Sequence, residues 1–440
     1  MAADTPKEYQ TLVIYEIYVR SHGPHGTFGD VEADLERIKS MGVDVIWFMP
    51  IHPIGEIAKK GSLGCPYSIA NYREINPAYG TREDFSQLIA RAHSLGLRVM
   101  IDVVYNHTAH DSHLLADHPD FYHLDAEGHP FTTVPDWSDV IDLKHPNPGL
   151  SAYLIETLQQ WAAFGVDGFR CDVASLLPQD FWLAARAAVS QVKPGVIWLA
   201  ESVHAGWVAS RRAHHLSGIS DSELYAAFDL TYDYDIWPLF QRAVQGTASV
   251  DRYLEALRFQ DCIYPANFVK MRYVENHDQP RIMAFAPSTN QALAWTAFQA
   301  FNKGAFLIYA GQESAADHTP SLFDFDPIRW QDYPLQPFLT KLTGLKKHPA
   351  VQDGQLIFLE GSPAIQASWH LPGESLYGIF NVAAASQVIP VHLSDGVYKD
   401  LLSGESISVE GGHIQAPQSA CILQQAEPTR LTPIFSPLLD

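Results

Sequence analysis

The chain has 440 residues, of which 47% are hydrophobic, 12% aromatic and only 18% charged. A sequence this apolar can build a large core, which excludes a disordered protein. The net charge of −21 excludes the basic surface that nucleic acids and anionic membranes require, and it favours a neutral ligand.

The amino-terminal segment shows no targeting signal. Residues 1–20 lack the charged and then apolar parts of a signal peptide, and no apolar stretch approaches the roughly 18 residues of a membrane span. We therefore expect a cytoplasmic protein, or a secreted one whose leader has been removed. Cys65, Cys171, Cys262 and Cys421 are widely spaced without a CxxC pair, which favours a reducing compartment and gives no zinc signal.

Short apolar runs alternate with amphipathic helical patterns over most of the chain. The runs occupy residues 12–19, 43–50, 97–105, 166–174, 196–202, 226–232, 268–276 and 305–311. Several helical patterns end in glycine, among them VEADLERIKSMG and LSAYLIETLQQWAAFG. Eight such units predict an α/β fold, a (β/α)₈ TIM barrel whose parallel strands are covered by helices. A doubly wound open sheet is the alternative, but no GxGxxG follows the first strand.

Two of the predicted βα loops are long, spanning 51–80 and 106–148. The second is rich in His, Asp and Pro, and we interpret it as a small subdomain inserted after strand three. Beyond the barrel the pattern changes to short alternating strands, which predicts a C-terminal antiparallel β-sandwich. We therefore divide the chain into a catalytic barrel, 1–350, and a sandwich domain, 351–440. The proline-rich tail, 426–440, predicts only packing on a surface.

Polar side chains follow four of the predicted strands at their carboxyl ends, where barrel enzymes place their chemistry. They are Asp102, Asn106 and His107 after the third strand, Arg170 and Asp172 on the fourth, Glu201 after the fifth, and Glu275, Asn276, His277, Asp278 and Arg281 after the seventh. One such strand end is explained most simply by ordinary cap and loop residues. Four that converge on one mouth predict an active site.

The stretch GFRCDVAS places Arg170 and Asp172 two positions apart in an apolar strand, so both leave by one face. A carboxylate beside a guanidinium keeps a low pKa and suits a nucleophile, whereas Glu201, flanked by the apolar Leu199 and Ala200, suits a protonated general acid. Neighbouring strands lie about 4.8 Å apart, so the two carboxyls can reach the roughly 5–5.5 Å separation of a retaining glycosidase. A structural ion pair beside an unrelated glutamate is the alternative.

The motifs DVVYNH, GFRCDVAS, LAES and VENHDQPR resemble, in order and spacing, those of the α-amylase superfamily, glycoside hydrolase family 13. The resemblance covers nearly the whole chain and is strongest to bacterial α-amylases and neopullulanase-like enzymes. It implies a retaining, endo-acting hydrolase of α-1,4-glucosidic bonds in starch and maltodextrins. It also implies that Asp172 is the nucleophile, Glu201 the general acid/base and Asp278 the third carboxylate that holds substrate hydroxyls.

The resemblance and the strand ends together give a set of substrate-binding candidates. The set is Tyr67, Asp102, His107, Trp137, Arg170, His277 and Arg281. Trp137, in the loop VPDWSDVIDLKHPN, can either stack on a glucose ring or anchor its loop. Val173 resembles the valine of enzymes that handle α-1,6 bonds, although a β-branched residue also simply suits a strand.

The predicted chemistry requires no cofactor. Asn106 resembles an asparagine that binds structural calcium in many amylases, and further oxygen donors lie nearby at Asp111, Asp117, Asp120, Asp136 and Asp139. Because no DxDxDG-like loop is present, we expect either a structural calcium ion or an Asn106 that only bonds the loop backbone.

The expected partner is a neutral α-glucan, with no nucleic acid and no membrane, and a monomer is favoured. The rival activities are those of a neopullulanase, a cyclomaltodextrinase or a 4-α-glucanotransferase. The rival of a different class is an inactive carbohydrate-binding relic.

Overall fold

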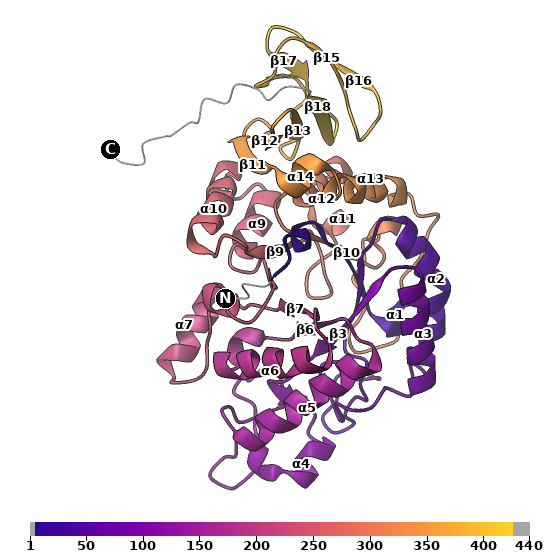
Figure 1. Ribbon diagram of the computed structural model, residues 1–440, viewed down its shortest axis with the longest axis vertical. Helices are drawn as coiled ribbons and strands as arrows, with labels where there is room; N and C mark the ends of the chain where they lie inside the picture. Colours follow the sequence, from indigo (N-terminus) through magenta and orange to yellow (C-terminus); the bar gives the residue numbers. More distant parts are fainter. Residues whose placement is uncertain (1–4, 426–440) are drawn as a thin grey trace.

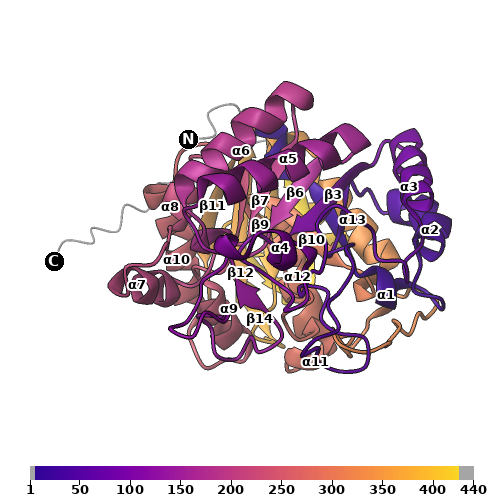
Figure 2. The ribbon, with the colours of Figure 1, turned by 90° about the horizontal axis from the view of Figure 1, so that it is seen from below.

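The computed structural model describes residues 5–425, and its centre is a closed barrel of eight parallel strands (Figures 1 and 2). Around the barrel the strands follow the order β1-β10-β9-β8-β7-β6-β3-β2. They are β1 (Val13–Ile17), β2 (Val45–Phe48), β3 (Arg98–Val103), β6 (Gly168–Cys171), β7 (Ile197–Ala200), β8 (Leu230–Tyr232), β9 (Val269–Arg272) and β10 (Ala305–Tyr309). Each strand lies inside one predicted run, so the TIM-barrel prediction is confirmed.

Helices cover the outside of the barrel and surround its strands in Figure 1. The longer ones are α2 (Phe28–Ser40), α3 (Arg82–Ser94), α5 (Pro148–Phe164), α6 (Gln179–Val192), α10 (Val250–Ile263), α12 (Thr289–Phe301) and α13 (Gln336–Lys346). Shorter ones are α1 (Val19–His22), α7 (Ala205–Ala213), α8 (Asp221–Leu224), α9 (Trp237–Val244), α11 (Ile282–Phe285) and α14 (Pro349–Asp353).

Local sequence signals set the ends of these helices. Thr27 and Thr81 each form a capping box with the aspartate three residues later, which satisfies free N–H groups at the starts of α2 and α3. Gly165 ends α5 with a φ of 126°, a conformation that favours glycine. The chain can therefore turn back sharply from α5 into β6, which carries Arg170.

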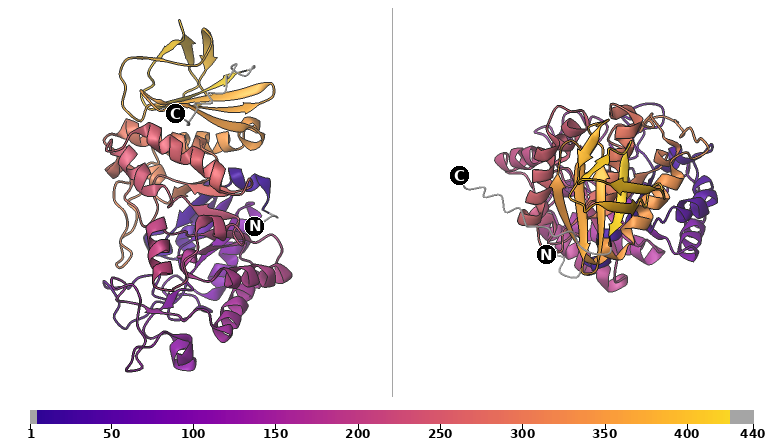
Figure 3. Two further views of the ribbon diagram at one scale, coloured as in Figure 1. Left: turned by 90° about the vertical axis from the view of Figure 1, so that its left-hand side faces the viewer. Right: turned by 90° about the horizontal axis from the view of Figure 1, so that it is seen from above.

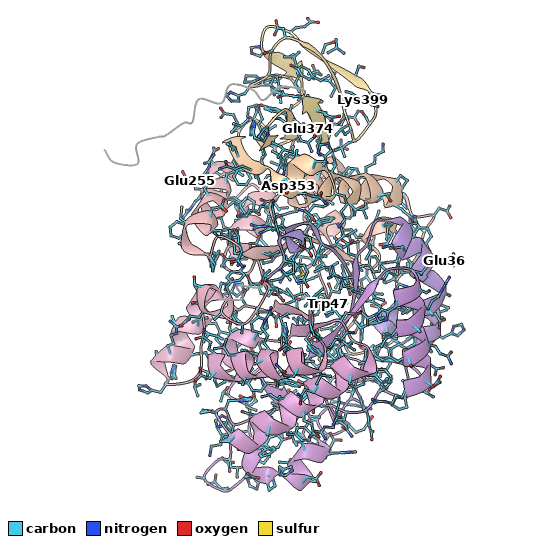
Figure 4. The ribbon with its side chains drawn as sticks, viewed as in Figure 1. Glu36, Trp47, Glu255, Asp353, Glu374 and Lys399 are labelled. Atoms are coloured by element: carbon cyan, nitrogen blue, oxygen red, sulfur yellow. The ribbon has the colours of Figure 1, made fainter. Side chains whose placement is uncertain are left out.

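The barrel interior is filled by large side chains. Trp47 on β2 is fully buried and lies near the centre of the barrel in Figure 4, whereas Glu36 lies on the outer side of α2. The Trp47 ring lies 5.3 Å from the Arg170 guanidinium and 5.9 Å from the His277 ring, centroid to centroid. A buried aromatic ring thus packs beneath Arg170 and His277 inside the barrel.

The long segment after β3 forms a small layer of its own below the barrel in Figure 1. It contains β4 (His107–Thr108), α4 (His113–Asp117), a 3₁₀ turn (Pro119–Phe121) and β5 (Ile141–Asp142). The strands β4 and β5 pair antiparallel, with His107 opposite Asp142. This pairing ties the far end of the loop back to the end of β3.

The C-terminal region is antiparallel, as predicted, and lies at the opposite end of the molecule from α4 (Figure 3). Its main sheet has the order β11-β12-β13-β18, formed by β11 (Gln355–Glu360), β12 (Ile365–Leu371), β13 (Glu374–Phe380) and β18 (Ala420–Gln425). Two further pairs are β14 (Val388–Pro390) with β17 (His413–Gln415), and β15 (Gly396–Lys399) with β16 (Ser406–Val409).

The alternation of side chains along the main sheet explains its two packed faces. Trp369 and Leu376 belong to the core shared with the barrel helices, whereas Tyr377 and Ile379 pack with residues of the two strand pairs, including Ile414. The second layer therefore consists of two short strand pairs. Sequence patterns did not predict β15 or β17, because both are short and largely exposed.

Two further sequence expectations concern the C-terminal tail and membrane-spanning segments. The tail 426–440 lies outside the described residues. Within residues 5–425, no helix is both long enough and apolar enough to cross a membrane.

Candidate active site

Asp172 and Glu201 lie side by side at the carboxyl ends of neighbouring strands. The last register pair of β6 and β7 is Cys171 with Ala200, and the next residue on each strand is one of the two carboxylates. The Glu201 N–H donates to the Cys171 carbonyl at 3.0 Å, which continues the ladder by one step. Parallel pairing thus delivers both carboxyls to one point of the barrel mouth.

Arg170 holds three carboxylates with one guanidinium. Its Nη1 lies 2.9 Å from Asp102 Oδ1 and 3.0 Å from Asp172 Oδ1, and its Nη2 lies 3.0 Å from Glu201 Oε1. Its Nε donates to the Tyr232 hydroxyl at 3.1 Å. The guanidinium is completely buried, so it fixes the carboxylates from below without solvent competition.

Burial sets the proton affinity of the pair. Desolvation raises the pKa of Asp172 to about 7, and the opposing effect of Arg170 does not cancel it. Desolvation likewise raises the pKa of Glu201 to about 7. We expected a low pKa for Asp172, but Arg170 is shared with Asp102 and Glu201 and does not favour one carboxylate. Near neutral pH the coupled pair therefore shares one proton.

Val173, directly after Asp172, has a left-handed backbone, with φ 35° and ψ 44°. A β-branched residue avoids this region, so the strand explanation for Val173 does not hold. The turn points the Val173 N–H at Glu201 Oε2, which accepts it at 2.6 Å. Local strain thus gives Glu201 a second fixed partner and links its position to the Asp172 strand.

His277 and Tyr67 form a pair of stacked rings next to Asp102 and Asp278. Their rings stack at 5.4 Å, and the Tyr67 hydroxyl lies 2.8 Å from His277 Nε2 and donates to Asp102 Oδ2 at 3.0 Å. His277 Nδ1 bonds Glu16 of β1. Burial lowers the pKa of His277, but Asp278 and Glu16 outweigh burial and raise it to about 9, so the imidazole is charged at neutral pH.

Asp278 is the accessible member of the three predicted catalytic carboxylates. Its side chain is 38% exposed, whereas Asp172 and Glu201 are buried. Its Oδ2 lies 3.2 Å from His277 Nε2 and accepts from the Tyr234 hydroxyl at 3.5 Å. A carboxylate held at the mouth in this way can accept hydrogen bonds from hydroxyl groups of a ligand.

His107 and two tryptophans border the mouth next to the loop subdomain. Burial lowers the pKa of His107 to about 4, so its imidazole is neutral. Its ring lies 5.1 Å from that of Trp137, which in turn lies 5.7 Å from Trp207 of α7. Both tryptophans pack against a small apolar cluster that includes Val173.

Comparison with known proteins places this site in a family. The sequence family model for the alpha amylase catalytic domain matches residues 16–121 and 122–332. The family model for the bacterial alpha amylase C-terminal domain matches residues 359–423. The chain belongs to the α-amylase family. The resemblance found in the sequence motifs is thereby confirmed.

Two solved structures are similar to this α-amylase family member over nearly its whole length. An alpha-amylase from Lactobacillus plantarum is 41% identical, with a TM-score of 0.91, over 96% of this chain and 100% of that one. The maltogenic alpha-amylase AmyB from Thermotoga neapolitana is 33% identical, with a TM-score of 0.85, over the same shares of the two chains. The arrangement of barrel, loop subdomain and C-terminal sheet therefore recurs in enzymes of this family.

Curated relatives are more distant and mostly longer. Alpha-amylase MalA of Haloarcula japonica is 29% identical over 70% of this chain and 45% of its own length. An alpha-1,4-glucan:maltose-1-phosphate maltosyltransferase of Corynebacterium glutamicum is 30% identical over 58% of this chain and 39% of its own. The chain thus spans less than half the length of both proteins.

Three predicted substrate-binding residues of this amylase-family site are enclosed by protein. Asp102 and Arg170 are fully buried and bond each other, and Arg281 is 1% exposed, pairing with Glu275 at 2.7 Å. All three side chains are held by other protein groups, and their direct contact with substrate stays a prediction. They position the residues around them.

Several residues of the site were not predicted from the sequence. Glu16 holds His277, Tyr232 holds Arg170, and Trp207 borders the mouth beside Trp137. A signal existed for Glu16, which is a lone charge in the apolar run LVIYEIYV, as Arg170 is in its own run. No comparable signal marked the two aromatic residues.

The surroundings of Asn106 do not fit a calcium ion. Asn106 lines a cavity with Asp142, His123, His145 and Arg211, which is one carboxylate among imidazoles and a guanidinium. Calcium takes six to eight oxygen ligands. Within residues 5–425, no three His, Cys, Asp or Glu side chains gather as a metal-binding group.

The loop carboxylates considered as further calcium donors do not line this cavity. Asp111 accepts from the Glu56 N–H at 2.8 Å, and Asp139 pairs with Lys60 at 2.8 Å. The Asn106 side chain lies against His107, with Nδ2 3.2 Å from Nδ1. Its backbone carbonyl accepts from the Leu143 N–H at 2.9 Å, which ties the end of the loop to the segment after β3.

Proposed function

We propose that this protein is a retaining α-glucan hydrolase that cleaves internal α-1,4-glucosidic bonds by double displacement. Asp172 attacks the anomeric carbon and forms a covalent glycosyl ester, while Glu201 gives its proton to the departing glucosidic oxygen. Glu201 then removes a proton from water, which attacks the anomeric carbon, breaks its bond to Asp172 and releases the carboxylate, so that the pair again holds one proton. Asp278 holds hydroxyl groups of the distorted sugar.

One observation carries this proposal: Asp172 and Glu201 each contact a different nitrogen of the same guanidinium, at 3.0 Å. These contacts are compatible with the roughly 5–5.5 Å that separates the two carboxyls in retaining enzymes. With one proton on the pair, one carboxyl is ionised and can act as nucleophile, and the other is protonated and can act as acid, as the first step of the reaction requires.

The activity is tested by following products from maltoheptaose, pullulan and β-cyclodextrin over time. We expect short maltooligosaccharides from maltoheptaose early in the reaction, as an endo-acting enzyme gives, and slower attack on pullulan and β-cyclodextrin. Fast cleavage of β-cyclodextrin would instead indicate a cyclomaltodextrinase. An absence of turnover on all three substrates would contradict the proposal.

Transglycosylation is the second candidate, and the tryptophan pair favours it. Trp137 and Trp207 are half-buried and pack against the apolar cluster that contains Val173. The Val173 N–H in turn donates to Glu201, so the tryptophans lie close to the acid/base. The acid/base lies on the leaving-group side of a glycosidase site, so the pair can stack on the leaving or accepting sugar. A well-held acceptor sugar competes with water for the covalent intermediate.

We expect Trp207→Ala to lower the share of transfer products from maltotriose by about 2- to 10-fold, the effect of losing one stacking contact. Mass spectrometry of products longer than the substrate measures this share. Phe259→Ala, which removes an exposed aromatic on α10, is the control and should change nothing. An unchanged product distribution in Trp207→Ala would exclude the stacking role.

We expect the pH profile of kcat/KM to have its alkaline limb near neutrality. The reaction needs one proton on the pair, so the rate falls when the pH drops below the first ionisation and again when it rises above the second. Burial raises the pKa of Glu201 from an ordinary 4.5 to about 7, which moves the alkaline limb upward. An alkaline limb below about pH 5 would contradict this environment.

A further inference from the structure

Arg211 of α7 connects the helix that follows the acid/base to the loop subdomain. Its Nη1 donates to Thr133 Oγ1 at 3.1 Å, across the boundary between α7 and the loop. Its Nε donates to the Ser217 carbonyl at 3.0 Å, which fixes the guanidinium from behind. The side chain is half-buried, so both bonds are sheltered from water.

Thr133 carries this connection on to Asp142. The Thr133 hydroxyl donates to Asp142 Oδ2 at 2.6 Å and the Thr133 N–H donates to the same oxygen at 2.8 Å. Asp142 is 3% exposed and lies opposite His107 in the β4–β5 pair. A continuous chain of bonds therefore runs from α7 to the strand that presents His107.

The charges in this cavity balance without a metal ion. Asp142 Oδ1 is buried and has no hydrogen-bond partner among residues 5–425, so a nearby positive charge must stabilise it. Arg211 lines the same cavity; burial lowers the pKa of its guanidinium, and the nearby Asp142 carboxylate opposes that effect by attracting the positive charge. Burial lowers the pKa of His123 and His145, so neither adds positive charge at neutral pH. A divalent cation placed here would be repelled by the guanidinium.

We infer that Arg211 takes the place of a structural cation at this junction and that the protein is stable without calcium. The guanidinium supplies the positive charge that Asp142 needs, and it ties the loop subdomain to the barrel. This inference concerns stability, so it stands or falls independently of the proposed activity.

The first test measures the thermal unfolding midpoint of the full chain after dialysis against a chelator, and then with Ca²⁺ up to about 1 mM, the weak end of protein calcium sites. We expect the two midpoints to agree within about 1 °C. Titration calorimetry with CaCl₂ should show no binding at this site. A saturable rise of the midpoint with Ca²⁺ that disappears in Asp142→Asn would place an ion in the cavity and overturn the inference.

The second test replaces the guanidinium itself. We expect Arg211→Met to lower the midpoint by roughly 2–4 °C, because it removes a charged hydrogen bond and leaves Asp142 uncompensated. Arg211→Lys, which keeps the charge, should lose less. The matched control is Arg212→Met on the same helix, since Arg212 bonds the Gly218 carbonyl and an exposed Glu223. If Arg211→Met behaves like Arg212→Met, the inference is wrong.

Discussion

Asp172→Asn is expected to reduce turnover of maltooligosaccharides by roughly 10⁴-fold or more, because an amide cannot form the glycosyl ester. The fold should survive, since Asn keeps an oxygen that accepts the bond Arg170 now gives to Oδ1 at 3.0 Å. Initial rates on maltoheptaose measure the loss. Asp180→Asn, an exposed substitution at the start of α6, is the control. Normal activity in Asp172→Asn would remove this residue from the mechanism.

The same variant has an expected signature in stability. Burial raises the pKa of Asp172 from 3.8 to about 7, so the folded protein binds this proton more tightly than the unfolded chain does. The contribution of this group to folding stability therefore falls as the pH rises from about 4 to about 7. Asp172→Asn should unfold at a higher temperature than the wild type above pH 7, with the difference vanishing near pH 4. A midpoint lowered at every pH would show that the amide disrupts the site.

Glu201→Gln is expected to lower turnover of maltooligosaccharides by about 10²- to 10⁴-fold, the range for loss of a general acid. The reason is that an amide has no acidic proton to give to the leaving oxygen. α-Maltosyl fluoride needs no such proton, so it should still form the covalent intermediate. Because the base for water is also lost, the reaction should stop after one turnover, giving a burst of fluoride equal to the enzyme concentration.

The burst separates the roles of the two carboxylates. Asp172→Asn cannot form the intermediate and should release no burst from the same fluoride. Equal losses on both substrates in Glu201→Gln, without a burst, would show that Glu201 is not the acid. The two variants together therefore distinguish the nucleophile from the acid/base, although burial raises both pKa values alike.

Strand periodicity made the barrel and its polar strand ends predictable. Arg170 and Asp172 stand out because charges interrupt an apolar strand, and parallel pairing then places Glu201 beside them. Contacts that close the barrel were not predictable in this way. Glu16 lies on β1 and His277 follows β9, and the closed barrel leaves only β10 between these two strands, although the two residues are 261 positions apart in the sequence.

Two further features depend on conformations that residue type does not signal. The left-handed turn at Val173 is disfavoured for a valine, so no local preference predicts it. The low pKa expected for Asp172 assumed that Arg170 pairs with this carboxylate alone. In the structure Arg170 also contacts Asp102 and Glu201. The pKa values of this site therefore depend on how many groups share one cation, which only the assembled barrel determines.

The most direct test of the central claim is the anomeric configuration of the first product, followed by NMR during hydrolysis of maltoheptaose. Double displacement on Asp172 with Glu201 as acid/base predicts that the α-anomer appears first and then mutarotates. A β-anomer as the first product would mean a single displacement by water, and Asp172 would then not be a nucleophile.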